Sequence, residues 1–467
     1  METNRELFEK TPVPKALATL AVPTIISQLI TMIYNLADTF FIGMTDDPYK
    51  VAASSVAFVL IFAMNCLSNL FGVGGGSLIS RLLGEKREGD AASVASFSFY
   101  GSLLISAVYS ILLYIFMDPF LRLLGATDNT IGYATDYALW VVVVGAVPST
   151  LGLTMSHLLR SEGYAKHSSF GLALGGVLNI ILDPIFMFVI LEPGNEVAGA
   201  AIATMISNIA VFLYFLGVYF AIRKKTVLSL SPAIMIPKKH YIFSVFAVGF
   251  PSALGSFLAC LSSIMVNKLS SLHGDIAVAA IGIAKKIDML PMNVGMGLCQ
   301  GMMPLVAYNF AAKNYERMKK FSDTARLWGI GFAAVCILVF EIFAAPICEI
   351  FIGEPETLAM STKFLRILCL AVPLMIVNFQ MSFTFQAMGM GKQSLLLSSL
   401  RQGLINIPLL FLMNHLFGLD GIVWTQLISD ILTTVISFAV YKVSYGKLMR
   451  ESAIMSEIAN ESCQKAV

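Results

Sequence analysis

The sequence predicts an all-α integral membrane protein with twelve transmembrane helices in two parallel, pseudo-symmetric lobes of six. Composition, the number of long apolar segments and an internal repeat together support this fold class. Of the 467 residues, 57% are hydrophobic and 13% are charged, and the mean hydropathy is +0.78. Soluble domains carry about 25% charged residues. The composition therefore excludes an ordinary soluble fold, and the net charge of +2 does not indicate a nucleic-acid partner.

Twelve apolar segments are long enough to cross a bilayer, which takes about 20 residues of helix. Several are longer and contain proline, so we expect tilted or kinked helices. The first apolar run is too long for a signal peptide and is expected to remain as a membrane helix. The segments lie at residues 15–43, 51–82, 92–117, 130–159, 166–190, 197–222, 241–270, 276–310, 322–346, 358–388, 394–416 and 420–444.

Lys and Arg are distributed unequally between the connections. Most lie on the N-terminal side of the predicted membrane, and the opposite connections hold only Lys50, Arg122 and Lys363. Basic connections remain in the cytoplasm. We therefore expect a multi-pass protein of the plasma membrane, in a bacterium the inner membrane, with both termini cytoplasmic.

The two halves of the chain repeat each other at an offset of 222 to 228 residues. Ala21-Val-Pro23 resembles Gly249-Phe-Pro251, Gly176-Val-Leu-Asn179 resembles Gly403-Leu-Ile-Asn406, and further matches follow in the same order. An even number of helices per repeat gives two lobes of the same orientation, as in many secondary transporters. The predicted division is an N-tail 1–14, an N-lobe 15–222, a linker 223–240, a C-lobe 241–446 and a C-tail 447–467.

Acidic residues inside the predicted helices of the N-lobe indicate a functional site, because membrane interiors penalise charge. Asp38 lies five residues before the outer end of the first helix, about 7–8 Å deep, and Asp183 lies about 10 Å deep in the fifth. Thr204 of the sixth helix has a similar depth, and Asn179 shares a helix face with Asp183. These four residues are our predicted cation-coupling site.

The residues alone leave the bound ion open. Pro184 has no N–H, so the carbonyl of Ile180 loses its helical partner and becomes available to an alkali cation such as Na⁺, beside Asp38, Asn179 and Asp183. A proton suits the site as well, because low-dielectric surroundings disfavour two ionised carboxylates. The alternative is structural: the same side chains could simply hydrogen-bond neighbouring helices.

The C-lobe suggests a substrate cavity rather than a second ion site. Either Lys285 and Asp288 neutralise each other, or Lys286 or Asp288 faces substrate or transmits the coupling. Flexible methionines favour promiscuous binding. Arg401 and Asp430 are expected to pair, and Glu341 to lie near the outer rim or in a buried pair. The candidate cavity residues are Lys286, Asp288, Met289, Met292, Gln300 and Asn378.

Motifs for an enzyme are missing from the sequence. It contains no HExxH, no GxSxG-linked triad and no P-loop, and its seven cysteines form no CxxC pair. We therefore expect no enzymatic activity, no cofactor and no direct use of ATP.

Three motifs resemble those of the multidrug and toxic compound extrusion (MATE) family: Asn35-Leu-Ala-Asp-Thr-Phe-Phe-Ile-Gly43, Gly72-Val-Gly-Gly-Gly76 and Leu178-Asn-Ile-Ile-Leu-Asp-Pro184. The resemblance extends over residues 12–445 and includes the arrangement of two sets of six helices. The resemblance implies a V-shaped monomer that exports small organic cations or amphipathic drugs in antiport with H⁺ or Na⁺ by alternating access. It also implies a cation site at Asp38, Asn179, Asp183 and Thr204.

One departure from the family limits where the coupling site is expected. A branch of the family carries a glutamate in the seventh helix, whereas residues 241–270 contain no acid. The coupling site is therefore expected in the N-lobe. The alternative function is a lipid-linked glycan flippase of related architecture, which would need a strongly basic cavity for a pyrophosphate. The sequence does not specify the substrate or the stoichiometry.

Overall fold

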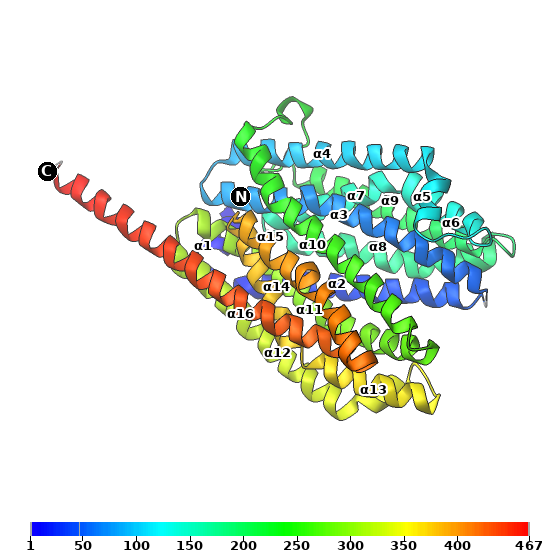
Figure 1. Ribbon diagram of the computed structural model, residues 1–467. Coiled ribbons are helices and arrows are strands. Elements are labelled where there is room, and N and C mark those ends of the chain that lie inside the picture. Colours follow the sequence, from blue (N-terminus) through cyan, green and yellow to red (C-terminus); the bar gives the residue numbers. More distant parts are fainter. Residues whose placement is uncertain (1, 46, 466–467) are drawn as a thin grey trace.

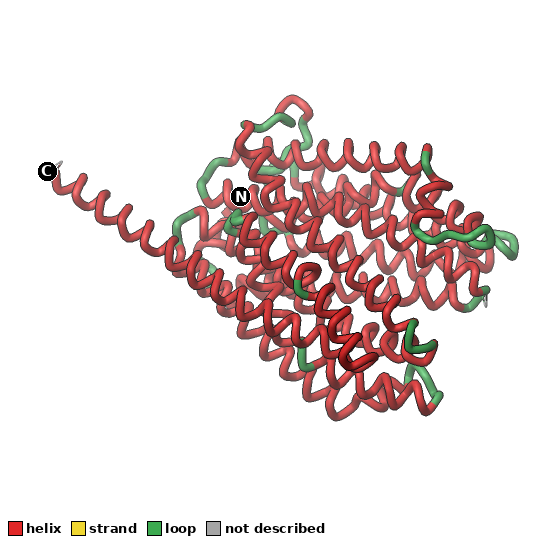
Figure 2. Tube along the Cα trace, viewed as in Figure 1, coloured by secondary structure: helices red, strands yellow, loops and turns green. Residues whose placement is uncertain are grey.

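The computed structural model describes residues 2–45 and 47–465, and within this part of the chain every regular element is helical (Figure 2). The helices form two bundles that meet at one end and diverge toward the other, which gives the molecule a V shape (Figure 1). This arrangement agrees with the predicted pair of lobes. Asp46, one of the acids of an expected external loop, lies outside the described residues.

The N-lobe follows a short N-terminal helix, α1 (Glu2–Glu9). Its fourth crossing is bent by 52° where α7 begins, and its fifth ends in a π-helical turn. The elements of this lobe are α2 (Val13–Gly43), α3 (Pro48–Gly84), α4 (Glu88–Ile115), α5 (Met117–Leu123), α6 (Ile131–Ala138), η1 (Leu139–Val144), α7 (Ala146–Ser161), α8 (Ala165–Ile185), η2 (Phe186–Ile190) and α9 (Glu196–Ile222).

The C-lobe repeats this order after a linker that contains η3 (Pro232–Ile234). A bend of 45° between α13 and α14 occupies the same place in the repeat as the bend before α7. Helical backbone continues through most of the predicted C-tail. The elements are α10 (Lys239–Ser271), α11 (Asp275–Ala311), α12 (Tyr315–Glu349), α13 (Pro355–Cys369), α14 (Val372–Ala387), α15 (Gly391–Ser399), η4 (Leu400–Leu404) and α16 (Asn406–Lys465).

The predicted twelve crossings can be identified among the described helices. Eight helices are long and apolar enough to span a membrane, or ten when each bent pair is one span. The long segment Gly391–Leu448 supplies two crossings rather than one, because its helix breaks at Gly418, where φ is 59°. Glycine adopts this conformation without strain. The remaining crossing is α11, which is more polar because Lys285, Lys286 and Asp288 lie in its interior.

Glycines allow helices of opposite lobes to pack backbone to backbone. A Cβ atom on Gly249 of α10 would lie 1.8 Å from the carbonyl oxygen of Leu70 in α3. Likewise, Cβ atoms on Gly297 and Gly301 of α11 would lie 2.7 Å and 2.5 Å from Cα atoms of α2. Such close approach is a common mode of helix association in membranes. The pairs α3–α10 and α2–α11 therefore join the two lobes.

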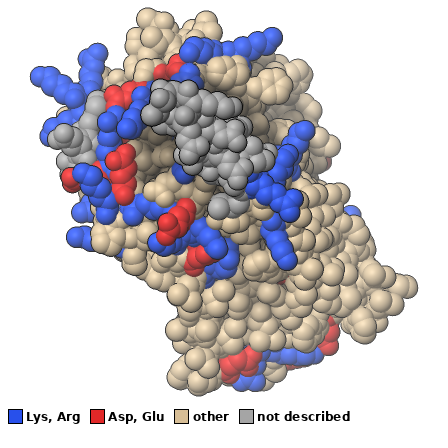
Figure 3. Space-filling view, turned by 90° about the vertical axis from the view of Figure 1, so that its left-hand side faces the viewer, with Lys and Arg blue, Asp and Glu red and all other residues tan. Residues whose placement is uncertain are grey.

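Basic side chains gather at the end where the lobes meet (Figure 3). We call this the basic end; it comprises α1 and the connections at residues 85–87, 162–164, 223–238 and 312–314. Phe8 of α1 is buried between the lobes and stacks on Tyr308, with 4.8 Å between ring centroids. The Nε atom of Arg317 donates to the carbonyl oxygen of Phe8 at 2.8 Å. The N-terminal helix thus closes the basic end.

A Gly249→Ala substitution tests the contact between α3 and α10. We expect the free energy of unfolding to fall by about 1–3 kcal/mol, because the added methyl group must displace a backbone. Gly217→Ala in α9 is the matched control: no atom lies within 4 Å of its Cβ position, so stability should be unchanged or slightly higher. Thermal unfolding of the purified proteins measures both effects. Equal stability of the two variants would contradict the proposed contact.

Candidate cation site in the N-lobe

Three helices of the N-lobe bring the predicted site residues together. Asn179 and Asp183 lie one turn apart in α8, and the Nδ2 atom of Asn179 donates to Oδ1 of Asp183 at 3.1 Å. The same nitrogen donates to Oγ1 of Thr204 in α9, also at 3.1 Å. Asp38 of α2 lies within electrostatic range of Asp183. The predicted cluster of Asp38, Asn179, Asp183 and Thr204 is therefore present as a spatial group.

Small residues bring these helices close to one another. A Cβ atom on Gly176, one turn before Asn179, would lie 2.9 Å from Cγ2 of Ile30 and 3.1 Å from Cδ1 of Tyr34 in α2. Gly199 allows α9 to approach the backbone of η2 in the same way, because a Cβ atom on Gly199 would lie 2.8 Å from the carbonyl oxygen of Phe186. The acids thus converge because no side chains separate their helices at this level.

The backbone after Asp183 departs from regular α-helix. Pro184 cannot donate a hydrogen bond to the carbonyl one turn earlier, and the following residues, Phe186–Ile190, adopt the wider π-helical pattern. Turns of this kind are common at functional sites. The local sequence therefore loosens the helix beside the carboxylate, whereas the availability of the Ile180 carbonyl to an ion stays a prediction.

The cluster contains acceptor atoms without donors. Asp183 and Asn179 are 0% and 2% exposed, and Asp38 is half-buried. Asp38 Oδ1, Asn179 Oδ1 and Asp183 Oδ2 are all buried without a hydrogen-bond partner. Among the described residues, no basic side chain forms an ion pair with the carboxylate of Asp38 or Asp183. None lies close enough to influence the ionisation of either carboxyl group. Buried polar atoms without partners are costly, and a bound proton or cation would offset this cost.

The donor set fits a hard cation. It consists of two carboxylates, an amide oxygen and a hydroxyl, the oxygen ligands that hard ions prefer over the nitrogen and sulfur of transition-metal sites. Within the described ranges, no group of three or more His, Cys, Asp or Glu residues could hold a metal. Either carboxylate could accept a proton instead. The donor types alone do not distinguish Na⁺ from H⁺.

Two tyrosines that sequence reasoning did not identify border the cluster. Tyr34 and Tyr137 both lie within electrostatic range of Asp38 and Asp183, and Tyr137 also lies near Thr204. Tyr34 precedes Asp38 by four residues on the same helix face, a spacing that could have identified it. Tyr137 comes from α6 in the bent fourth crossing, and no local pattern indicates its contact.

The C-lobe holds a neutralised charge pair rather than a second site of this kind. The predicted pair of Arg401 and Asp430 is confirmed: Nε lies 2.7 Å from Oδ1, with exposures of 7% and 0% for the two side chains. Asn378, a predicted cavity residue, is buried and donates to the carbonyl oxygen of Asp430 at 3.2 Å. Its side chain therefore belongs to the interior of the lobe.

The other predicted cavity residues do not gather at one place. Lys286 is exposed, whereas Gln300 accepts a hydrogen bond from Arg160 at 3.0 Å across the lobe boundary. Asp288, Met289 and Met292 are half-buried along α11. The described residues show no ion pair between Lys285 and Asp288, and Glu341 lies near Arg366 at 3.7 Å in a half-exposed pair.

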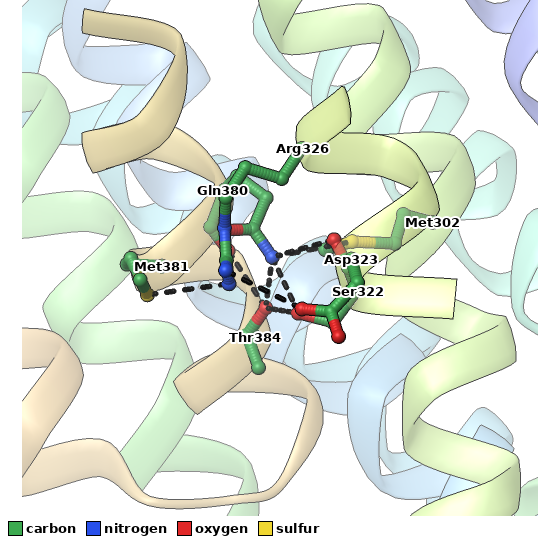
Figure 4. A network of polar contacts seen from close by, with 7 residues as sticks. All are labelled: Met302, Ser322, Asp323, Arg326, Gln380, Met381 and Thr384. Carbon is green, nitrogen blue, oxygen red and sulfur yellow. Dashed lines mark hydrogen bonds and ion pairs between the residues drawn. The ribbon is translucent and has the colours of Figure 1, made fainter. Parts of the chain in front are cut away.

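A second polar network, between α12 and α14, has donors and acceptors matched (Figure 4). The Nε2 atom of Gln380 donates to Ser322 Oγ at 2.5 Å and to Thr384 Oγ1 at 3.1 Å, and its Oε1 accepts from Arg326 at 3.2 Å. None of these atoms is left without a partner. This network connects two helices, and its polar atoms have partners without a bound ion, unlike those of the N-lobe cluster.

Comparison with known proteins identifies the family. A family model described as MatE matches the chain twice, at residues 23–185 and 251–412. The chain belongs to the MATE family. The two matches coincide with the two halves of the predicted duplication. Because the family consists of membrane transporters, the predictions of a twelve-helix transporter fold and of a protein that is not an enzyme are confirmed.

Relatives and solved structures agree with this assignment. The chain is 32% identical over 450 residues to "Multidrug export protein MepA" of Staphylococcus saprophyticus subsp. saprophyticus, covering 96% of this chain and 98% of the relative. It is 33% identical over 451 residues to the protein of the same name from Staphylococcus aureus strain MSSA476, with the same coverage.

Among solved structures, a multidrug resistance MATE family transporter described in an outward-facing conformation superimposes with a TM-score of 0.89 at 23% identity, covering 96% of this MATE chain and 99% of the other. A transporter of the MOP superfamily from Pyrococcus furiosus gives a TM-score of 0.87 at 23% identity over 95% and 98% of the two chains. At this identity the likeness establishes the fold.

The buried pair in the C-lobe yields a stability prediction. Arg401→Met should lower the free energy of unfolding by about 3–5 kcal/mol, because it leaves Asp430 buried without its cation. Arg366→Met is the control, since removing the half-exposed pair with Glu341 should cost about 1 kcal/mol or less. Chemical denaturation of the purified variants measures the difference. If Arg401→Met costs no more than Arg366→Met, the structural role of the pair is refuted.

Proposed function

We propose that this MATE chain is a secondary active efflux transporter that exports cationic or amphipathic organic compounds in antiport with H⁺ or Na⁺. The observation that carries the proposal is the set of three buried, partnerless oxygen atoms on Asp38, Asn179 and Asp183. The relatives named multidrug export proteins support the class of substrate. The membrane would be the bacterial plasma membrane, with the protein acting as a monomer.

The orientation of the lobes supports an alternating-access cycle. We assign the basic end to the cytoplasm because of its lysines and arginines. The lobes are packed together at this end and diverge at the other, so the structure corresponds to a state closed to the cytoplasm. Exchange with a state open to the cytoplasm would export a substrate bound between the lobes.

Helix α2 connects the ion site to the lobe boundary. It carries Asp38 on one side of the cluster, and its backbone contacts Gly297 and Gly301 of α11 in the other lobe. A proton or Na⁺ bound between Asp38 and Asp183 reduces the repulsion between their carboxylates and so changes the contact between α2 and α8. Because α2 also packs on α11, its displacement changes the contact between the lobes. Coupling follows if the ion binds the two states with different affinities.

Transport in vesicles of purified protein tests this proposal. The vesicles contain a fluorescent organic cation, and a pH gradient or a Na⁺ gradient is imposed separately. We expect one gradient to drive transport by the parent protein. Asp38→Asn and Asp183→Asn should reduce gradient-driven transport to the level of protein-free vesicles, since each removes an ion-binding carboxylate. Asp420→Asn is the control, because Asp420 forms only an exposed pair with Lys363 at 2.6 Å.

The outcomes separate the parts of the proposal. If neither gradient drives transport by the parent, antiport with H⁺ or Na⁺ is refuted. If Asp183→Asn behaves like Asp420→Asn, the ion site is wrongly assigned although the transport function stands. Direct measurement of substrate binding to each variant shows that it is folded.

A further inference from the structure

A small cavity lies on the boundary between the two lobes, next to the basic end. Helices α3 and α7 line it from the N-lobe, and α11 and α14 line it from the C-lobe; Arg160, His157, Gln300 and Phe383 are among its residues. Its volume of about 20 Å³ has room for one water-sized group. The cavity exists only while the lobes are packed together.

Arg160 brings an uncompensated positive charge to this cavity. Its side chain is 3% exposed. Nη1 donates to Oε1 of Gln300 at 3.0 Å, and Nη2 donates to Ser156 and Ser168 at 3.3 Å and 3.1 Å. Nε is buried without a hydrogen-bond partner. Every hydrogen-bond partner of this guanidinium among the described residues is neutral.

The surrounding residues do not supply the missing negative charge. Glu162, two residues along the chain, directs its carboxylate to the linker, where it accepts from the backbone N–H of Val227 at 2.7 Å and from Thr226. Arg81 follows Ser80 of the cavity wall, and its Nε and Nη2 atoms are also buried without partners. The region thus concentrates positive charge and unused N–H donors.

The C-lobe shows a contrasting arrangement. The buried guanidinium of Arg401 has the carboxylate of Asp430 at 2.7 Å. Burying a charge without a counter-charge is strongly unfavourable. The last turn of α7, where Arg160 lies, provides a partial negative charge from the helix dipole, but this offsets only part of the cost. A mobile anion would supply the remainder.

We propose that a small monovalent anion of the chloride class binds in this cavity beside Arg160. The water-sized space suits a monatomic anion, and the free Nε–H supplies a charge-assisted donor. Because both lobes form the cavity, the anion binds only when they are packed at the basic end. Binding therefore stabilises that state. The inference does not depend on the identity of the coupling cation.

Halide-dependent stability of the purified full chain tests the proposal. Unfolding temperature is measured in sodium chloride, bromide and gluconate at constant Na⁺ concentration and ionic strength, so that the cation site contributes equally. A ligand that binds only the folded state raises this temperature. We expect a saturable increase with chloride and bromide and none with gluconate.

Two substitutions and a control locate the effect. Arg160→Met should abolish the halide-dependent shift, whereas Arg160→Lys, which keeps the charge, should retain it at higher halide concentrations. Arg366→Met, at a half-exposed pair outside the cavity, should respond like the parent protein. The proposal is overturned if the parent protein shows no halide-dependent shift in unfolding temperature, or if Arg160→Met shows the same shift as the parent.

A structural measurement decides the matter even if Arg160→Met does not fold. Crystals of the parent protein grown in bromide should show an anomalous scattering peak in the cavity, within hydrogen-bond distance of Arg160. A bromide-containing crystal in the same closed state without a peak in the cavity overturns the proposal.

Discussion

The organisation of the N-lobe depends on the cost of burying carboxylate oxygens without partners. Asp38 and Asp183 come from different helices, and neither has a basic partner among the described residues. A structural pair of this kind would ordinarily be neutralised, as Asp430 is by Arg401. Under the proposed function, a proton or a cation that can be exchanged meets this cost in the N-lobe. The conformation of the lobe would then be sensitive to the ions outside it.

The rest of the architecture connects this sensitivity to the lobe boundary. Gly176 sets the distance between α2 and α8, and the glycines of α11 hold α2 against the other lobe. The C-lobe is fastened by a network around Gln380 whose donors and acceptors are matched. Under the proposed function, the N-lobe would respond to ions, whereas the polar network of the C-lobe is satisfied without one. An anion beside Arg160 would bind at the lobe boundary itself and stabilise the state in which the lobes are packed together.

Sequence reasoning anticipated the spans, the duplication and the pair Arg401–Asp430, because apolar length, repeats and isolated intramembrane charges are local signals. It also grouped Asp38, Asn179, Asp183 and Thr204, since rise per residue gives depth and periodicity gives the face of a helix. It missed Tyr137 and the contact between Arg160 and Gln300, which depend on which helices face each other. The 52° bend before α7 and the π-helical turns rotate those faces without a readable sequence pattern.

Infrared difference spectroscopy of the purified protein tests the central claim most directly, because it observes the carboxyl groups themselves. We expect a protonated carboxyl band that disappears on raising the pH or adding Na⁺, and that is reduced in both Asp38→Asn and Asp183→Asn. If no carboxyl band responds to pH or Na⁺, or if the band persists unchanged in both variants, these acids do not bind the coupling ion.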